Sequence, residues 1–219
     1  MSQTTTHAVR LSEVTAHYGR VPALRGVSLG IPDGRVTALL GHNGSGKSTL
    51  LNVLAGLHRP SSGEVHANHR HRPALVVQRS EATDSLPITV RQTVAMGRWA
   101  HRAVWRRASQ RDKEIVNDCL QRLGMAELAE TPLGRLSGGQ RQRALLAQGL
   151  AQQSDLLLLD EPATGLDTAT AETLAELLPR LSESGVTIVH ATHDAQLAAR
   201  ADHCVSLSRG RLADTGERG

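Results

Sequence analysis

Aromatic residues are nearly absent from this sequence. Its 219 residues include no Phe, and the aromatic side chains are Tyr18, Trp99 and Trp105. A hydrophobic core must therefore be built from aliphatic side chains, which the 39% of hydrophobic residues can supply. Because one Tyr cannot form an aromatic core, the position of Tyr18 near the start of the chain needs a separate explanation.

Cysteines and long hydrophobic runs are also scarce. Cys119 and Cys204 lie far apart and match no metal-binding or redox spacing, so we expect reduced thiols in a cytosolic protein. The N-terminus has no signal-peptide pattern. No apolar run approaches the roughly 20 residues that a membrane-spanning helix needs. If the protein serves a membrane, we expect it to act at the cytoplasmic face through another chain.

The charge has a positive excess. The formal net charge is +4 and the isoelectric point is about 9.8, which would fit nucleic acid, anionic lipid or a nucleotide as a partner. The basic residues do not form one continuous run, so we interpret most of them as solvated surface. Charge alone therefore does not identify a partner.

Short apolar runs alternate with helical patterns along the chain. Residues 59–73 are rich in Pro, Ser, His and Arg, and we interpret them as a connection. This alternation predicts an α/β fold with a mostly parallel sheet. We expect helices over 48–55, 140–151 and 168–184. We expect strands over 9–14, 24–31, 36–40, 74–77, 156–159, 186–190 and 205–207, the last being the final strand.

The pattern also predicts the domain organisation. A length of 219 residues favours one domain, 1–219, with a subdomain inside it. Residues 81–136 differ from their surroundings because they combine helical periodicity with both tryptophans and many arginines. We predict a helical subdomain over 81–136, inserted into a core formed by 8–80 and 137–213.

A glycine-rich loop directly follows the apolar run 36–40. Its spacing fits G-x-x-x-x-G-K-[ST], a phosphate-binding pattern when it lies between a buried strand and a helix. Glycines let the backbone wrap around phosphate, and the helix start adds a positive dipole end. Lys47 can reach the β- and γ-phosphates, and the Ser48 hydroxyl can ligate Mg²⁺. We predict that ATP and Mg²⁺ bind at Gly41, His42, Asn43, Gly44, Ser45, Gly46, Lys47, Ser48 and Thr49.

A second motif supplies carboxylates. Asp160 and Glu161 follow the run 156–159, four leucines that predict a buried central strand. Ligand-binding residues of α/β folds lie at the carboxyl ends of strands. We assign Asp160, with Ser48, to Mg²⁺, and Glu161 to polarising the water that attacks the γ-phosphate.

The sequence between these motifs carries a family resemblance. Leu136-Ser137-Gly138-Gly139-Gln140 resembles the signature sequence of ABC ATPases, and the resemblance covers about residues 9–213. It implies a RecA-like P-loop NTPase core with a mostly parallel sheet, an N-terminal antiparallel β region and an inserted helical subdomain. Small residues and a hydroxyl before a helix suit a second phosphate cradle.

In the family, this second cradle closes over the γ-phosphate bound to the other protomer. The resemblance therefore implies a homodimer on ATP binding, with Ser137 and Gly139 acting in trans and with Gly138 and Gln140 in the same cradle. Gly165-Leu166-Asp167 resembles the loop that signals across the dimer, although the usual first residue, Ser, is replaced at Thr164-Gly165.

Three other positions match site residues of the family. Tyr18 takes the place of the aromatic residue that stacks on adenine, and an ordinary half-buried tyrosine is the alternative. Gln78 resembles the glutamine that senses Mg²⁺ and the attacking water. His193, within Thr-His-Asp, resembles the switch histidine that contacts the γ-phosphate, with His190 as the competing candidate.

The resemblance also implies partners. No membrane span is fused to the chain, so a separate integral membrane permease is expected. The stretch Val94–Trp99, with the sequence VAMGRW, resembles ATPases of metal and metal-chelate importers, and the short connection from 63 to 78 resembles the zinc/manganese group. We expect import of a divalent metal, zinc ahead of manganese, with an extracytoplasmic metal-binding protein as an indirect partner.

Other functions remain as alternatives. They are iron-chelate or cobalamin-type import, and export through a separate permease. An ABC ATPase acting on nucleic acid or ribosomes is a further rival, but one ATPase unit with a short helical insert argues against it. We predict no nucleic-acid partner.

Two groups of basic residues allow two interpretations each. The histidines at 58, 66, 69 and 71 could form a regulatory zinc site or a solvated loop, and their spacing matches no closed zinc motif. The arginines at 91, 98, 102, 106, 107 and 111 could face a permease or acidic lipid. A solvated helix face is the favoured interpretation for them.

Overall fold

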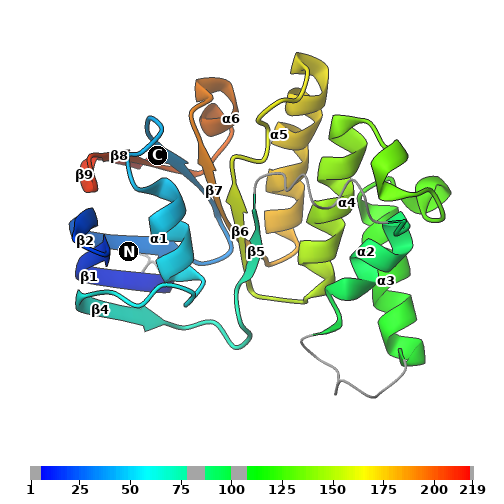
Figure 1. The fold of residues 1–219 in the computed structure, drawn as a ribbon, viewed down its shortest axis with the longest axis horizontal. Coiled ribbons are helices and arrows are strands. Elements are labelled where there is room, and N and C mark those ends of the chain that lie inside the picture. Colours follow the sequence, from blue (N-terminus) through cyan, green and yellow to red (C-terminus); the bar gives the residue numbers. More distant parts are fainter. Residues whose placement is uncertain (1–5, 78–86, 100–107, 218–219) are drawn as a thin grey trace, which may run out of the picture.

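The computed structural model describes residues 6–77, 87–99 and 108–217. Two β-sheets lie on one side of the molecule and the helices α2–α5 gather on the other (Figure 1). Among the described residues, no helix is both long enough and apolar enough to cross a membrane. The arrangement agrees with the predicted α/β class.

An antiparallel sheet forms the N-terminal region. Its strands are β1 (His7–Tyr18), β2 (Val21–Pro32) and β4 (Ser62–Ala67), in the order β2-β1-β4. The predicted strands at 9–14 and 24–31 lie within β1 and β2. The interpretation of 59–73 as a connection is wrong, because β4 pairs along the edge of β1. Its residues are polar and mostly exposed, so no apolar alternation marks the strand.

The second sheet has six strands in the order β5-β6-β7-β3-β8-β9. All neighbouring pairs are parallel except β8 and β9. The prediction that the strand at 205–207 is the last one is wrong, because a turn at Arg209 and Gly210 leads into the polar strand β9. The bounds are β3 Val36–Leu40, β5 Ala74–Val76, β6 Leu156–Asp160, β7 Thr187–Thr192, β8 His203–Ser208 and β9 Arg211–Glu217.

The leucines of β6 show why the six-stranded sheet forms. All four are at most 1% exposed, and alternate members face different cores. Leu156 and Leu158 pack with α1 (Lys47–Leu54) and the antiparallel sheet. Leu157 and Leu159 pack with helices on the other face. A strand buried on both faces reads as a continuous apolar run, which is why this strand was predictable.

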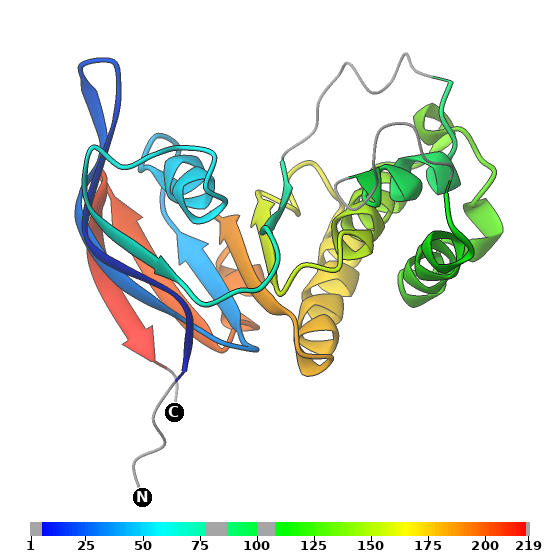
Figure 2. The ribbon, with the colours of Figure 1, turned by 90° about the horizontal axis from the view of Figure 1, so that it is seen from below.

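Helices α2, α3, α4 and α5 lie together on the side of the six-stranded sheet away from α1 (Figure 2). Capping boxes at Thr89, Ser109 and Ser137 fix where α2, α3 and α4 begin. The predicted helix 140–151 starts two residues earlier, at Gly138. The bounds are α2 Val90–Met96, α3 Gln110–Arg122, α4 Gly138–Ala151, α5 Thr168–Glu183 and α6 Ala195–Ala199, with 3₁₀ turns at Ala126–Leu128 and Leu133–Arg135.

Arg98 joins three of these helices. It is 6% exposed, its Nε lies 3.0 Å from Oδ1 of Asp112 on α3, and its guanidinium donates to the Ala151 carbonyl at the end of α4. Hydrogen bonds from Ser109, and then the Arg98 guanidinium, lower the pKa of Asp112 to about 2. The favoured interpretation of the insert arginines as solvated is therefore wrong for Arg98. Arg102, Arg106 and Arg107 lie outside the described residues.

Candidate functional site

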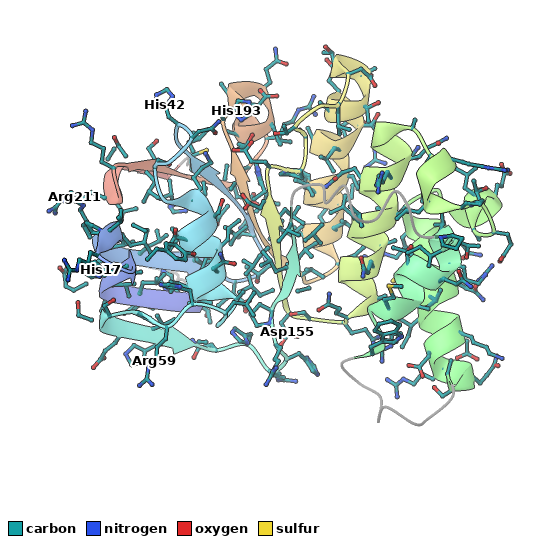
Figure 3. The ribbon with its side chains drawn as sticks, in the orientation of Figure 1. His17, His42, Arg59, Asp155, His193 and Arg211 are labelled. Atoms are coloured by element: carbon teal, nitrogen blue, oxygen red, sulfur yellow. The ribbon has the colours of Figure 1, made fainter. Side chains whose placement is uncertain are left out.

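Three loops meet at the carboxyl edge of the six-stranded sheet. Strands β6, β7 and β3 are consecutive neighbours, so the residues that follow them come together. These residues are Glu161 after β6, His193 after β7, and the glycine-rich loop after β3. Figure 3 shows His42 and His193 at the same edge, with Asp155 at the opposite edge.

The glycine-rich loop has a conformation that needs glycine. Gly44 and Gly46 have φ values of 78° and 108°, in the left-handed region. A Cβ at Gly46 would lie 2.7 Å from the Ala23 carbonyl oxygen. Ser45 is buried, and its hydroxyl has no hydrogen-bond partner among the described residues. Since α1 begins directly afterwards, the loop offers backbone N–H groups, a free hydroxyl and a helix start to an anion.

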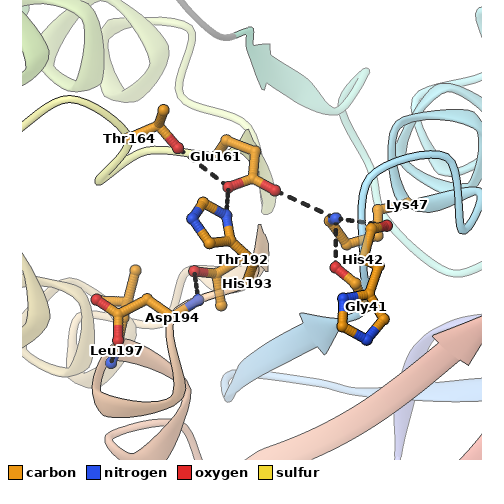
Figure 4. A network of polar contacts seen from close by, with 9 residues as sticks. All are labelled: Gly41, His42, Lys47, Glu161, Thr164, Thr192, His193, Asp194 and Leu197. Atoms are coloured by element: carbon orange, nitrogen blue, oxygen red, sulfur yellow. Dashed lines mark hydrogen bonds and ion pairs between the residues drawn. The ribbon is translucent and has the colours of Figure 1, made fainter.

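Lys47 lies under this loop and is 5% exposed. Its Nζ donates to the carbonyls of Gly41 and His42, at 2.6 and 3.3 Å. It also lies 3.2 Å from Oε1 of Glu161, as Figure 4 shows. The ammonium thus connects the glycine-rich loop to the acidic residue after β6.

Both carboxylate oxygens of Glu161 have partners. Oε2 lies 2.7 Å from Nδ1 of His193 and accepts a hydrogen bond from the Thr164 hydroxyl at 3.1 Å. Partial burial acts to raise the pKa of this carboxyl, but the Lys47 ammonium and the hydrogen bonds with His193 and Thr164 outweigh it and hold the pKa below its ordinary value. The backbone φ of Glu161 is 50°, which is uncommon for a non-glycine residue. The group is therefore an anion in a specific, strained position.

Asp160 and Ser48 provide oxygen donors of the kind that Mg²⁺ prefers. Oδ1 of Asp160 is buried and accepts no hydrogen bond from the described residues. A buried carboxylate oxygen without a partner is costly unless a ligand completes it. Ser48 is exposed at the start of α1. The residues present fit a hard divalent cation beside the glycine-rich loop.

The two candidate histidines differ in position. His193 reaches Glu161, and its side chain is 58% exposed. His190 is 1% exposed within β7, and burial lowers the pKa of its imidazole to about 4. Neither ring nitrogen of His190 has a hydrogen-bond partner in the described part of the chain. The geometry therefore brings His193, and not His190, to the site.

Ser137, Gly138, Gly139 and Gln140 lie at the start of α4, which packs on the face of the sheet opposite α1. Ser137 and Gln140 hydrogen-bond to each other, and a Cβ at Gly139 would lie 2.2 Å from Thr170. Asp167 caps α5 by accepting hydrogen bonds from Thr170. In a single chain these residues do not join the contacts around Lys47 that Figure 4 draws.

The remaining predicted site residues are Tyr18, Gln78 and the clustered histidines, and the structure shows contacts for only some of them. Tyr18 is 52% exposed, and its ring lies 4.7 Å from the ring of His58. Gln78 lies outside the described residues. Of the clustered histidines, His66 pairs with Glu64 and His71 with Asp155. No group of three or more potential ligands that could hold a metal ion occurs among the described residues.

Sequence reasoning noted Thr164 only as a departure from the usual loop sequence and did not identify Asp112. Thr164 hydrogen-bonds to Glu161, and Asp112 pairs with Arg98. A hydroxyl three residues after Glu161, in the turn that follows a buried strand, is a signal that could have identified Thr164. No local signal links Arg98 to Asp112, because they are 14 positions apart in the sequence.

Comparison with known proteins identifies relatives of the whole chain. The family model described as "ABC transporter" matches residues 24–164. The manganese transport system ATP-binding protein MntA of Synechocystis is 39% identical, over 87% of this chain and 77% of its own. The ferric enterobactin transport protein FepC of Escherichia coli is 38% identical, over 95% and 81%. The zinc transport protein TroB of Treponema pallidum is 37% identical, over 97% and 82%.

Solved structures agree with these relatives. A metal-chelate type ABC transporter in an inward-facing conformation superposes with a TM-score of 0.89, at 30% identity, over 96% of this chain and 83% of that one. The bacterial ABC transporter cassette MJ0796, described as dimeric, gives a TM-score of 0.82 at 28% identity, over 96% and 99%.

Proposed function

The chain belongs to the ABC transporter family and is an ABC ATPase, and we propose that it powers import of a divalent metal ion through a separate membrane permease. The single observation that carries the catalytic part is the position of Glu161 between Lys47 and His193, beside a glycine-rich loop built for phosphate. The substrate part is supported by the names of the relatives.

We assign ATP to the glycine-rich loop, with Tyr18 stacking on adenine. The exposed Tyr18 ring supports this, because an exposed aromatic face can accept a base. On ATP binding, Lys47 would leave its contacts with Glu161 and with the carbonyls of Gly41 and His42, and would bind phosphate oxygens instead. Ser48, Asp160 and Gln78 would hold Mg²⁺, which offsets the charge on the phosphates when bound. Glu161 would then take a proton from the attacking water, with His193 beside it.

Two copies of the chain would complete each site. Ser137 to Gln140 lie on the opposite face of the sheet from α1, so they cannot cover the phosphate loop of their own chain without rearrangement. A second copy can supply them, with the loop 165–167 at the same interface. The dimeric relative supports this arrangement. We propose that ATP binding closes a homodimer and that hydrolysis reopens it.

The helical region supplies a surface for the permease. A groove of about 340 Å³ lies between α2 and α3, with Ala95, Ala108 and Val116 in its lining and Arg91 and Lys113 also contributing. An apolar groove flanked by charged side chains suits a short amphipathic helix of another protein. We propose that the permease docks here from the membrane side, which places the chain at the cytoplasmic face of the membrane.

The substrate is the least constrained part of the proposal. We favour zinc and then manganese as the transported ion, and relatives named for each metal support a divalent ion without ranking the two. Import of a ferric chelate is supported equally by FepC. The stretch Val94–Trp99 does not distinguish between these substrates, because structural contacts account for two of its residues. Gly97 packs closely against the Gln148 carbonyl, and Arg98 forms an ion pair with Asp112. An extracytoplasmic binding protein would deliver the substrate to the permease.

ATP turnover in liposomes tests the proposal. The chain is reconstituted with its permease, and binding protein is added empty or loaded with zinc, manganese or a ferric chelate. Stimulation by one loaded form would identify the substrate and the direction of transport. Equal turnover with all forms would refute metal import. The complex carrying Glu161→Gln is the control for ATP consumption by contaminants.

A further inference from the structure

We propose that Thr164 is a positioning residue for Glu161. Its hydroxyl, together with His193, holds Oε2 of the carboxylate, so that Oε1 is the oxygen that receives the proton of the attacking water. This inference rests on the proposed ATP hydrolysis, and it assigns a function to a residue that the sequence patterns identified only as a departure from the usual serine.

The two carboxylate oxygens of Glu161 have different partners. Figure 4 shows them directed to opposite sides, with Oε1 toward Lys47 and Oε2 toward His193 and Thr164. Lys47 is the residue expected to move its contacts to phosphate when ATP binds. Oε1 then loses its partner while Oε2 keeps both of its own. The carboxylate is left with one held oxygen and one oxygen free to act as a base.

Thr164 is itself held in place by the chain. Its backbone N–H donates to the Glu161 carbonyl at 3.1 Å, and the Glu161 N–H donates to the Ala191 carbonyl at the same distance. The hydroxyl contact to Oε2 closes a second link within the same turn. Because threonine is branched at Cβ, its χ1 angle is restricted, and the hydroxyl stays aimed at the carboxylate. The strained backbone of Glu161 is thus fixed from both ends.

The proton transfer balances without any further reactant. One O–H bond of water breaks, and its proton goes to Oε1 of Glu161. The water oxygen forms a bond to the γ-phosphorus, and the bond from that phosphorus to the bridging oxygen breaks, with its electron pair leaving on ADP. Phosphate later takes up the proton. Thr164 donates its hydrogen bond to Oε2 throughout and exchanges no proton.

The position of Thr164 also connects Glu161 to the predicted dimer loop. Thr164 directly precedes Gly165, Leu166 and Asp167, and Asp167 caps α5. Movement of this loop on dimer closure would move the hydroxyl that holds Oε2. A site closed by a second copy would therefore have an aligned base, and an open site would not.

Substitutions at Thr164 test the inference in the full chain. Thr164→Val removes the hydroxyl and keeps the shape, and we expect kcat to fall about 10-fold, the scale of losing a hydrogen bond to a charged group. Thr164→Ser keeps the hydroxyl that bonds to Oε2, so its kcat should stay within about twofold of the wild type. The affinity for ATP should not change in either variant. Thr173→Val, which removes a hydroxyl bonded to the Ala169 carbonyl, is the matched control.

The split between kcat and KM separates positioning from a general structural effect. Because the Thr164 hydroxyl is bonded to the Glu161 carboxylate, Thr164→Val should lower kcat and leave the KM for ATP at the wild-type value. Thr164→Ser should restore kcat. In a Glu161→Gln background, Thr164→Val should slow residual turnover no further. If the valine variant does not fold, Thr164→Ala removes the same hydroxyl.

Two results would overturn the inference. One is a Thr164→Val chain with the wild-type kcat, and the other is a Thr164→Val substitution that slows the Glu161→Gln variant as much as it slows the wild type. Failure of the proposed function is distinguishable, because Glu161→Gln would then hydrolyse ATP as fast as the wild type.

Discussion

Among the residues that the structure describes, two buried ion pairs are alike in distance and burial. Lys47 and Glu161 are 3.2 Å apart, with side chains 5% and 11% exposed. Arg98 and Asp112 are 3.0 Å apart, with side chains 7% and 11% exposed. The two pairs differ in their surroundings. The atoms around Arg98 and Asp112 are hydrogen-bonded, whereas unpaired polar atoms lie near Lys47 and Glu161.

Both partners of the Arg98–Asp112 pair make further hydrogen bonds. Arg98 also donates to the last carbonyl of α4, where a cation complements the helix dipole. Asp112 accepts two hydrogen bonds from Ser109, whose hydroxyl in turn caps α3. A buried ion pair is stable when further hydrogen bonds satisfy its remaining atoms, as they do here.

Polar groups near the Lys47–Glu161 pair are available to bind a ligand. Glu161 has a left-handed backbone, and the buried oxygens of Ser45 and Asp160 have no partner among the described residues. Strain and unpaired polar atoms persist where function requires them. Distance and burial alone therefore do not distinguish an ion pair with satisfied surroundings from the pair that we assign to the ATP site.

The largest expected effect is on hydrolysis through Glu161. Glu161→Gln keeps the size of the side chain and removes the base, so turnover should fall about 10³-fold, or about 4 kcal/mol in activation free energy. The melting temperature should change little, since the residue belongs to the exchangeable pair. Steady-state phosphate release and thermal unfolding measure the two quantities. Turnover at the wild-type rate would remove Glu161 from the mechanism.

Breaking the Arg98–Asp112 pair should lower the stability of the fold, whereas Glu161→Gln mainly lowers turnover. Arg98→Met leaves Asp112 buried without its cation, and the free energy of unfolding should fall by about 3 kcal/mol. Adding Asp112→Leu should recover most of the loss, because an apolar pair of similar volume removes the unpaired charge. Urea unfolding measures both variants. A loss below about 0.5 kcal/mol for Arg98→Met would place this pair among ordinary surface ion pairs.

Acid should weaken the Arg98 pair at a defined pH. Because the folded state lowers the pKa of Asp112 to about 2, its contribution is fully present above the ordinary aspartate value and is lost as pH falls toward 2. Asp112→Asn should be less stable at neutral pH, with a shallower loss of stability between about pH 4 and 2. Unfolding curves across this range test the sign. Parallel profiles for the two proteins would contradict it.

The smallest effect is expected at His190, a third type of buried group, whose ring nitrogens have no hydrogen-bond partner in the part of the chain that the structure describes. Burial lowers its pKa to about 4, so the unfolded chain binds a proton first as pH falls below about 6.5. Stability should therefore decline between about pH 6.5 and 4, by on the order of 1–2 kcal/mol at pH 5. His190→Val should remove this decline and leave ATP turnover intact. A decline of equal size in the variant would assign it to other groups.

Sequence patterns predicted the parts of the fold that depend on local signals. The four leucines of β6 and the glycine-rich loop after β3 are examples, because burial on both faces and close backbone approach each restrict residue type. Strands β4 and β9 escaped prediction because they are polar and exist through pairing with distant partners. The residues around Glu161 could be proposed individually. Their contacts could not, because three separate strands bring them together.

We propose that Lys47 and Glu161 give up their mutual contact when ATP binds. Binding of ATP with Mg²⁺ to Glu161→Gln and Lys47→Ala, measured by calorimetry beside the wild type, tests it most directly. Glu161→Gln removes the anion that competes with phosphate for Lys47, so it should bind ATP at least as tightly as the wild type. Lys47→Ala should bind about 100-fold more weakly, the scale of losing a buried charge-assisted contact. Equal losses in both variants, or wild-type affinity in Lys47→Ala, would contradict the account.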